Sequence, residues 1–253
     1  MVRRSRALVG LAIGVGAVVI ALGGVILGWS IQHHEATGAW ELPDTDDLVR
    51  VLRRGGGPSR VIFLDGRALA VTAGDDDAAQ LRSSVIAHQR RSRVQVPGWQ
   101  GGAARWREVV ACVRDLYAPF DVEVTDRVPA TDDYLRVVVG GRPGDIGASR
   151  TFTGLAPFNG GVIPRAIVFA FAAQVGHDPR AVCEVIGMET AHAYGLDHEH
   201  DCRDVMTYLP PCGPKVFVDV DARCGEATVR ACEGGAATQN SYRRLRDVLG
   251  LRR

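Results

Sequence analysis

The residues of this chain that could do metal chemistry are gathered in one short stretch, from Met188 to His198. His192 follows position 188 by one helical turn, so side chains at these two positions would project from the same face of a helix. Glu189 lies beside them, and Gly195 allows a sharp turn that brings His198 back toward the same point. Imidazoles bind divalent transition metals, and a neighbouring carboxylate can take a proton from metal-bound water. The spacing therefore predicts a metal centre formed by a helix and the loop after it.

This stretch resembles the active-site motif of the metzincin zinc peptidases. That motif reads HExxHxxGxxH and is followed by a methionine turn. Five positions of the chain match it in register, namely Glu189, His192, Gly195, His198 and Met206. The resemblance extends from the region of Trp106 to Tyr208. It implies a zincin-like α+β fold with a mixed sheet, an active-site helix, a methionine turn and a C-terminal helix.

The resemblance also implies a role for each matching residue. Zinc would be bound by His192 and His198, and Glu189 would act as general base. Met206 would form the floor beneath the site, and Tyr208 would donate a hydrogen bond to the transition state. The implied substrate is a polypeptide, and the implied cofactor is zinc.

Met188 departs from the family pattern, because it stands where the motif has its first histidine. A thioether is a neutral, soft ligand that suits copper(I) better than zinc. If ~10–16 kcal/mol of zinc binding is shared evenly among four ligands, losing one costs roughly 3–4 kcal/mol. We therefore expect zinc to bind weakly or not at all, unless His200 or Asp201 supplies a substitute ligand.

Two main functions are compatible with this motif. One is a metallopeptidase with a degenerate zinc site, and the other is an inactive pseudopeptidase that keeps the cleft as a peptide- or protein-binding module. Retention of Glu189 and Tyr208 favours hydrolysis, since a binding module needs neither, whereas Met188 favours the binding module. A structural surface domain, in which the motif has no role, is a third possibility. A net charge of +1 provides no field to hold nucleic acid, which we exclude as a partner.

Three amphipathic or capped segments predict the helices that would position this motif. Residues 103–117 place apolar side chains at helical spacing. Asp178 and Pro179 are typical of a helix start, and Gly195 of a helix end, so the motif should lie at the end of a second helix. A last helix is predicted over residues 240–249.

Short apolar runs predict the strands of one mixed sheet. Val61–Leu64 and Ala68–Thr72 flank an Asp-Gly pair, which predicts a β-hairpin. Further strands are expected at 120–124, 135–139 and 166–172. The last of these could be the edge strand on which a metzincin places an extended substrate, or a core strand with no ligand.

The six cysteines predict disulfides. Cys202 and Cys212 bracket Met206, Cys224 and Cys232 form a second local pair, and Cys112 and Cys183 remain, one on each predicted helix. The alternative for the last two is a pair of reduced core residues.

The N-terminal residues predict export. Arginines in residues 1–6 precede an uncharged stretch, 7–29, whose roughly 34 Å as a helix would span a membrane core of about 30 Å. The positive-inside rule then places the rest of the chain outside the cytoplasm, where disulfides form. We expect a transmembrane signal anchor at 7–29, a linker at 30–59 and a metzincin-like domain at 60–253. A long, cleaved signal peptide is the alternative, and it leads to the same compartment.

Overall fold

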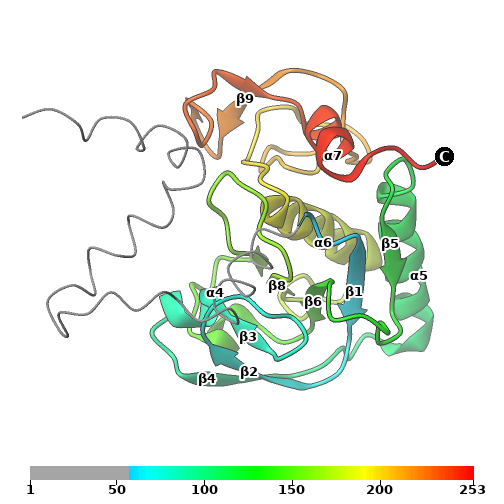
Figure 1. The fold of residues 1–253 in the computed structure, drawn as a ribbon, viewed down its shortest axis with the longest axis vertical. Coiled ribbons are helices and arrows are strands. Elements are labelled where there is room, and N and C mark those ends of the chain that lie inside the picture. Colours follow the sequence, from blue (N-terminus) through cyan, green and yellow to red (C-terminus); the bar gives the residue numbers. More distant parts are fainter. Residues whose placement is uncertain (1–56) are drawn as a thin grey trace, which may run out of the picture. The chain divides into compact units, whose positions relative to one another are not determined.

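A five-stranded mixed sheet runs through the part of the chain that the computed structural model describes, residues 57–253 (Figure 1). Its strand order is β5-β1-β6-β8-β7. The strands are β1 (Val61–Asp65), β5 (Glu123–Thr125), β6 (Leu135–Val139), β7 (Gly154–Leu155) and β8 (Ile167–Ala170). All neighbouring pairs are parallel except β7 with β8. The expected α+β class and mixed sheet are confirmed.

Each face of this sheet is covered by a different layer. Side chains alternate along a strand, so Ile62 and Leu64 of β1 join a core shared with α5 (Gly102–Leu116) and α6 (Pro179–Ala193). Phe63 points to the other face, into a second core. That core is closed by a small sheet of β2 (Leu69–Ala73), β3 (Arg82–Ser83) and β4 (Arg93–Val96), with α4 (Ser84–His88). A 3₁₀ turn follows β6 at Pro143–Ile146.

The three predicted helices are present, α6 begins at the predicted cap, and α7 begins at a side-chain cap as well. The Asp178 carboxylate accepts a hydrogen bond from the Ala181 N–H at 2.8 Å, and Pro179 occupies the first helical position of α6. In α7 (Ser241–Leu249) the side chain of Asn240 accepts from the Arg243 N–H at 2.8 Å. Helix α6 ends at Ala193, directly after His192 and two residues before Gly195.

The predicted hairpin between Val61–Leu64 and Ala68–Thr72 is wrong. Both strands form, but they belong to different sheets, because β5 and β6 pair with the two edges of β1. The Asp65 carboxylate is buried and forms ion pairs with Arg67 and Arg136. A buried, ion-paired aspartate ends the strand here, where the sequence pattern predicted a solvent-exposed turn.

Of the two alternatives for the strand at 166–172, the edge strand is wrong and the core strand is confirmed. Strand β8 lies inside the sheet, with β6 on one side and β7 on the other. Its four residues are all buried, which is typical of a strand covered on both faces. The edge is formed by the two-residue strand β7, which is too short to be recognised from its sequence.

The region after α6 carries two of three disulfides. Cys202–Cys212 and Cys224–Cys232 are local bridges, and Cys112–Cys183 joins α5 to α6, so all three predicted pairs are confirmed. The chain between α6 and α7 contains a small antiparallel sheet, β10-β9-β11, formed by Ala222–Gly225 (β9), Val229–Arg230 (β10) and Thr238–Gln239 (β11). Figure 1 shows β9 and α7 on the same side of α6.

The predicted membrane segment, residues 7–29, and the predicted linker up to residue 56 lie outside the described residues. Within residues 57–253, no helix has the length and apolar character needed to cross a membrane. Ser59, near the end of the predicted linker, is already fully buried. Its hydroxyl donates to Asp133 at 2.6 Å, and its carbonyl accepts from the Tyr194 hydroxyl at 2.8 Å.

Candidate functional site

The end of α6 and the loop after it bring two imidazoles together. The ring centroids of His192 and His198 lie 4.5 Å apart, and their planes are nearly perpendicular, at 86°. Gly195 makes this possible with a φ of +85°. A Cβ at this position would clash with the guanidinium of Arg244 and lie 2.8 Å from the carbonyl oxygen of Gly160. Glycine is therefore required here both for backbone conformation and for space.

His192 has a defined tautomer. Its Nδ1 atom lies 2.7 Å from the carbonyl oxygen of Leu196, and because a carbonyl only accepts, Nδ1 must carry the proton. Nε2 of the neutral ring is then left as an acceptor or metal ligand. Burial, with a contribution from His198, lowers the pKa of His192 to about 4. The ring is therefore neutral at pH 7.

His198 is the second imidazole available for a ligand. Its Nδ1 atom is buried and has no hydrogen-bond partner within the described residues. Burial lowers its pKa as well, opposed by the charge of Glu226. A buried nitrogen without a partner is costly unless a ligand satisfies it. Two neutral, converging imidazoles thus remain from the predicted metal centre.

Glu189 lies beneath the edge of the main sheet. It is 5% exposed, and burial raises its pKa to about 8, so the carboxyl is mostly protonated at neutral pH. Strand β7 passes directly over it, since a Cβ on Gly154 would lie 2.5 Å from Glu189 Oε1. A protonated carboxyl can donate a hydrogen bond to a carbonyl oxygen, which an ionised one cannot.

Met188 packs in the main core, where it is 8% exposed and shares a cluster with the fully buried Met206. Across residues 57–253 no three His, Cys, Asp or Glu side chains are arranged to hold a metal. Asp201 forms an ion pair with Arg203 at 2.6 Å, and Nε2 of His200 is buried with no hydrogen-bond partner among the described residues. Neither joins the two imidazoles in this arrangement. The residues present supply two donors and do not fit a three-ligand zinc site.

Met206 is held by hydrogen bonds through both its main-chain N–H and its carbonyl. The Met206 N–H donates to the Asp204 carboxylate at 2.8 Å, and its carbonyl accepts from the Glu199 N–H at 3.1 Å. Tyr208 follows the turn, 53% exposed, with its ring centroid 4.4 Å from that of His198. The predicted site residues thus lie on one helix end and on the two segments that follow it. They are Glu189, His192, His198, Met206 and Tyr208.

Sequence reasoning missed the residues that hold the His198 loop. Arg230 of β10 binds the buried carboxylate of Asp197, and Gln239 of β11 bonds to the main-chain N–H and C=O of the same residue. The Gly225 N–H donates to the His198 carbonyl at 3.0 Å, so Glu226 follows directly beside the site. These contacts join residues more than 25 positions apart, and no local pattern indicates them.

No family model matches this chain, and no curated protein matches it significantly. The resemblance to metzincins therefore stands on the motif residues and their arrangement alone.

Proposed function

We propose that the domain is a metzincin-like pseudopeptidase that binds extracytoplasmic polypeptides beside the end of α6, along strand β7. The observation that carries this proposal is the packing of Met188 in the core, one turn before His192. The position that would supply the first metal ligand is filled by an apolar, buried side chain. The site retains Glu189 and Tyr208 but has only two imidazole donors, His192 and His198.

The edge strand supports polypeptide as the ligand. Strand β7 has a sheet partner on one side, β8, and lies at the end of the strand order. An unpaired strand edge can accept an extended chain through main-chain hydrogen bonds. Glu189, directly beneath β7, is mostly protonated and would donate to a carbonyl of that chain. We also propose that the arrangement of this sheet, α6, the turn at Met206 and α7 is zincin-like.

Residual peptidase activity is the second candidate, and one specific observation favours it. The hydrogen bond from His192 Nδ1 to Leu196 O leaves Nε2 free, which is how a metal-binding histidine is normally oriented by its surroundings. A pure binding module has no need of this tautomer. The two candidates differ in the zinc content that they predict.

We also propose that the domain lies outside the cytoplasm. All six cysteines are paired, which agrees with folding in an oxidising environment. Together with the arginines of residues 1–6 and the uncharged stretch at 7–29, this supports a membrane-anchored or secreted protein whose domain lies outside the cytoplasm.

Metal content of three proteins tests the proposal. After dialysis against zinc and then buffer, mass spectrometry should find little zinc in the wild type and in Met188→Leu, which keeps the volume and adds no donor. Met188→His should hold about one zinc per chain, because it places an imidazole one turn before His192. Incubation with a reduced, carboxymethylated polypeptide should show binding without cleavage by the wild type.

Two results would overturn this proposal in different ways. Full zinc occupancy in the wild type, with cleavage that Glu189→Ala abolishes, would establish the peptidase. Absence of zinc in Met188→His would mean that the histidines do not converge, and the metzincin interpretation would be abandoned.

A further inference from the structure

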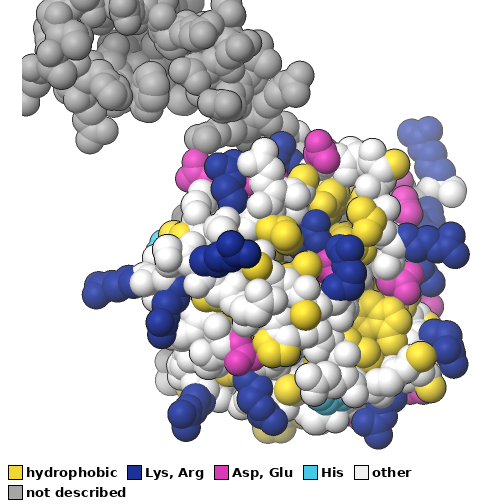
Figure 2. Space-filling model, turned by 90° about the horizontal axis from the view of Figure 1, so that it is seen from below, with side chains coloured by type: hydrophobic (Ala, Val, Ile, Leu, Met, Phe, Trp, Pro, Cys, Tyr) yellow, Lys and Arg dark blue, Asp and Glu magenta, His cyan; other side chains and the backbone are white. Residues whose placement is uncertain are grey.

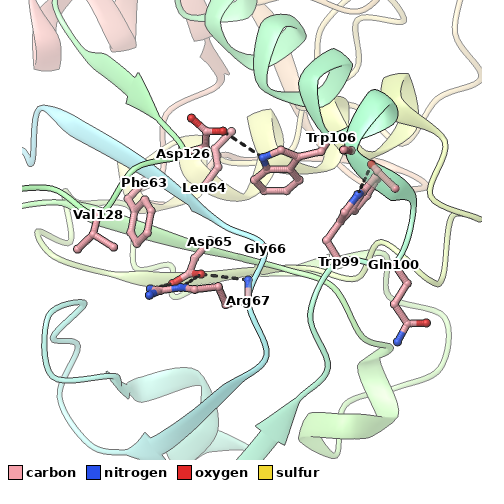
Figure 3. Close-up of a pocket in the computed structure, with 12 residues that line it drawn as sticks. Phe63, Leu64, Asp65, Gly66, Arg67, Trp99, Gln100, Trp106, Asp126 and Val128 are labelled. Carbon is pink, nitrogen blue, oxygen red and sulfur yellow. Dashed lines mark hydrogen bonds and ion pairs between the residues drawn. The ribbon is translucent and has the colours of Figure 1, made fainter.

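A cavity of about 600 Å³ lies at the carboxyl ends of the parallel strands β1 and β5, and none of its lining residues belongs to the site around His192 and His198 (Figure 3). Its size is in the range of small-molecule sites, and its walls are mostly apolar with a few polar groups. The carboxyl ends of parallel strands commonly carry ligand sites. This combination prompts the question of which ligand the cavity fits.

Two tryptophans form its main walls and are held in fixed orientations. Their ring centroids are 5.7 Å apart, with the planes tilted by 54°. The Trp106 indole N–H donates to Asp126 at 3.1 Å, and that of Trp99 donates to the carbonyl of Gly102 at 2.9 Å. Both rings are half-buried, and the ring centroid of His177 lies 5.1 Å from that of Trp99. Because both N–H groups are already used, a ligand can contact only the exposed parts of the rings, and little rotamer freedom is left to lose on binding.

Gly66 lets the two rings approach the floor of the cavity. A Cβ at this position would lie 3.1 Å from Trp106 and 3.3 Å from the Cβ of Trp99. The main chain also fixes this approach, since the Trp99 N–H donates to the Gly66 carbonyl at 2.8 Å. The site is therefore formed before any ligand arrives.

Polar side chains border these aromatic walls, as Figure 3 shows for Asp65, Arg67, Gln100 and Asp126. Their charges nearly cancel. Asp65 is paired with Arg67 and with the buried Arg136, and Arg114 lies 3.7 Å from Asp126. A strongly charged ligand would gain no net attraction from such a balanced border.

We propose that this cavity binds a pyranose ring of an oligosaccharide. One face of such a ring is made of C–H groups and can lie flat on an indole, while its edge carries hydroxyl groups that both donate and accept. Arg67, whose side chain is 58% exposed, can donate to these hydroxyls, and Asp126 and the exposed Gln100 can accept from them. On the face viewed in Figure 2, hydrophobic patches likewise lie directly beside basic and acidic side chains.

An apolar peptide side chain is the main competing ligand for an aromatic cavity. It would cover the polar border without giving Arg67, Gln100 or Asp126 a hydrogen-bond partner in place of water. Burying unpaired polar groups costs free energy that the apolar contact must offset. A neutral polyol satisfies the walls and the border together, and for this reason we favour it.

Calorimetric titration of the full-length chain in detergent with chitotriose, cellotriose and maltotriose tests the proposal. We expect at least one of these trisaccharides to bind, and Trp106→Ala to weaken that binding about tenfold or more. Gln100→Ala should leave the fold intact, because the residue is exposed. It should weaken binding several-fold. Phe152→Ala, which removes a 39% exposed aromatic ring that does not line the cavity, should leave binding unchanged.

The proposal is overturned if none of the three sugars binds at about 10 mM. It is also overturned if binding survives both Trp106→Ala and Gln100→Ala, because the sugar would then lie elsewhere. Tryptophan-dependent binding of N-acetyl-phenylalanine amide in place of the sugars would identify the cavity as a pocket for apolar side chains and would equally exclude the saccharide.

Discussion

Arg230 holds the buried carboxylate of Asp197 with both of its terminal nitrogens, at 2.6 and 2.7 Å. Asp197 directly precedes His198, whose own N–H donates to the same carboxylate at 2.8 Å. The small C-terminal sheet, through this arginine, therefore fixes the loop that carries the second imidazole. The hydrogen bonds from Arg230 hold the pKa of Asp197 below its ordinary value, against the effect of burial.

Replacing Arg230 by methionine should lower the free energy of unfolding by about 1–3 kcal/mol, because a buried carboxylate loses its partner. The estimate is kept low because the Arg230 side chain is 41% exposed and the pair is partly screened. Arg246→Met breaks a solvent-exposed pair with Asp247 and should cost about 0–1 kcal/mol. Urea denaturation measures both, and equal losses would contradict a special role for Arg230.

Gly195→Ala should destabilise the domain more than Gly234→Ala, although the two glycines have nearly the same φ, +85° and +83°. Both variants carry the conformational cost of a left-handed alanine, about 1 kcal/mol. Only at Gly195 does the new methyl group also clash with Arg244 and the Gly160 carbonyl, whereas nothing lies within 4 Å at Gly234. Thermal unfolding of the two variants side by side gives the difference, and identical melting temperatures would show that the turn at Gly195 relaxes freely.

The free energy of unfolding, measured with a chelator present, should fall as pH rises from about 4.5 to about 8 because of Glu189. Its pKa is raised by burial to about 8 in the folded state, so within this window the unfolded state binds fewer protons than the folded one. The slope for one such group is at most about 1.4 kcal/mol per pH unit. Glu189→Gln removes this loss, and the exposed Glu123→Gln should not. Parallel stability curves for wild type and Glu189→Gln would contradict the prediction.

Removing the disulfide between the helices should cost more than removing a local one. Cys112 and Cys183 are 71 positions apart, which corresponds to about 4 kcal/mol of chain entropy, against about 2–3 kcal/mol for the 8-position separation of Cys224 and Cys232. Each pair is replaced by two serines, and unfolding is followed in urea. The prediction does not hold if the Cys224/Cys232 variant is the less stable one.

Features that depend on neighbours along the chain were predictable from the sequence. The caps of α6 and α7, the positive φ of Gly195 and the pairing of nearby cysteines each follow from a few adjacent residues. The same holds for the spacing that brings His192 and His198 together.

Apart from the Cys112–Cys183 disulfide, whose cysteines remained once the two local pairs were assigned, features that depend on distant partners were not predictable. The Asp-Gly pair at the end of β1 has the composition of a hairpin turn. The strand is nevertheless buried on both faces, and it pairs with residues some sixty positions later. Strand β7 has only two residues, and the contact of Arg230 with Asp197 crosses 33 positions. In each case the partner is set by the tertiary structure, and a local sequence pattern carries no information about it.

The parallel pairing of β1 also determines the order in which the domain can fold. Val61 pairs with Glu123 and Ile62 with Leu135, so an apolar strand made early in synthesis has no partner until both of those segments have followed. Long-range parallel pairing is slow because the loop must close before any contact forms. During that interval β1 exposes an unpaired, aggregation-prone edge. The central strand of the main sheet can therefore be paired on both edges only after β6 has been made.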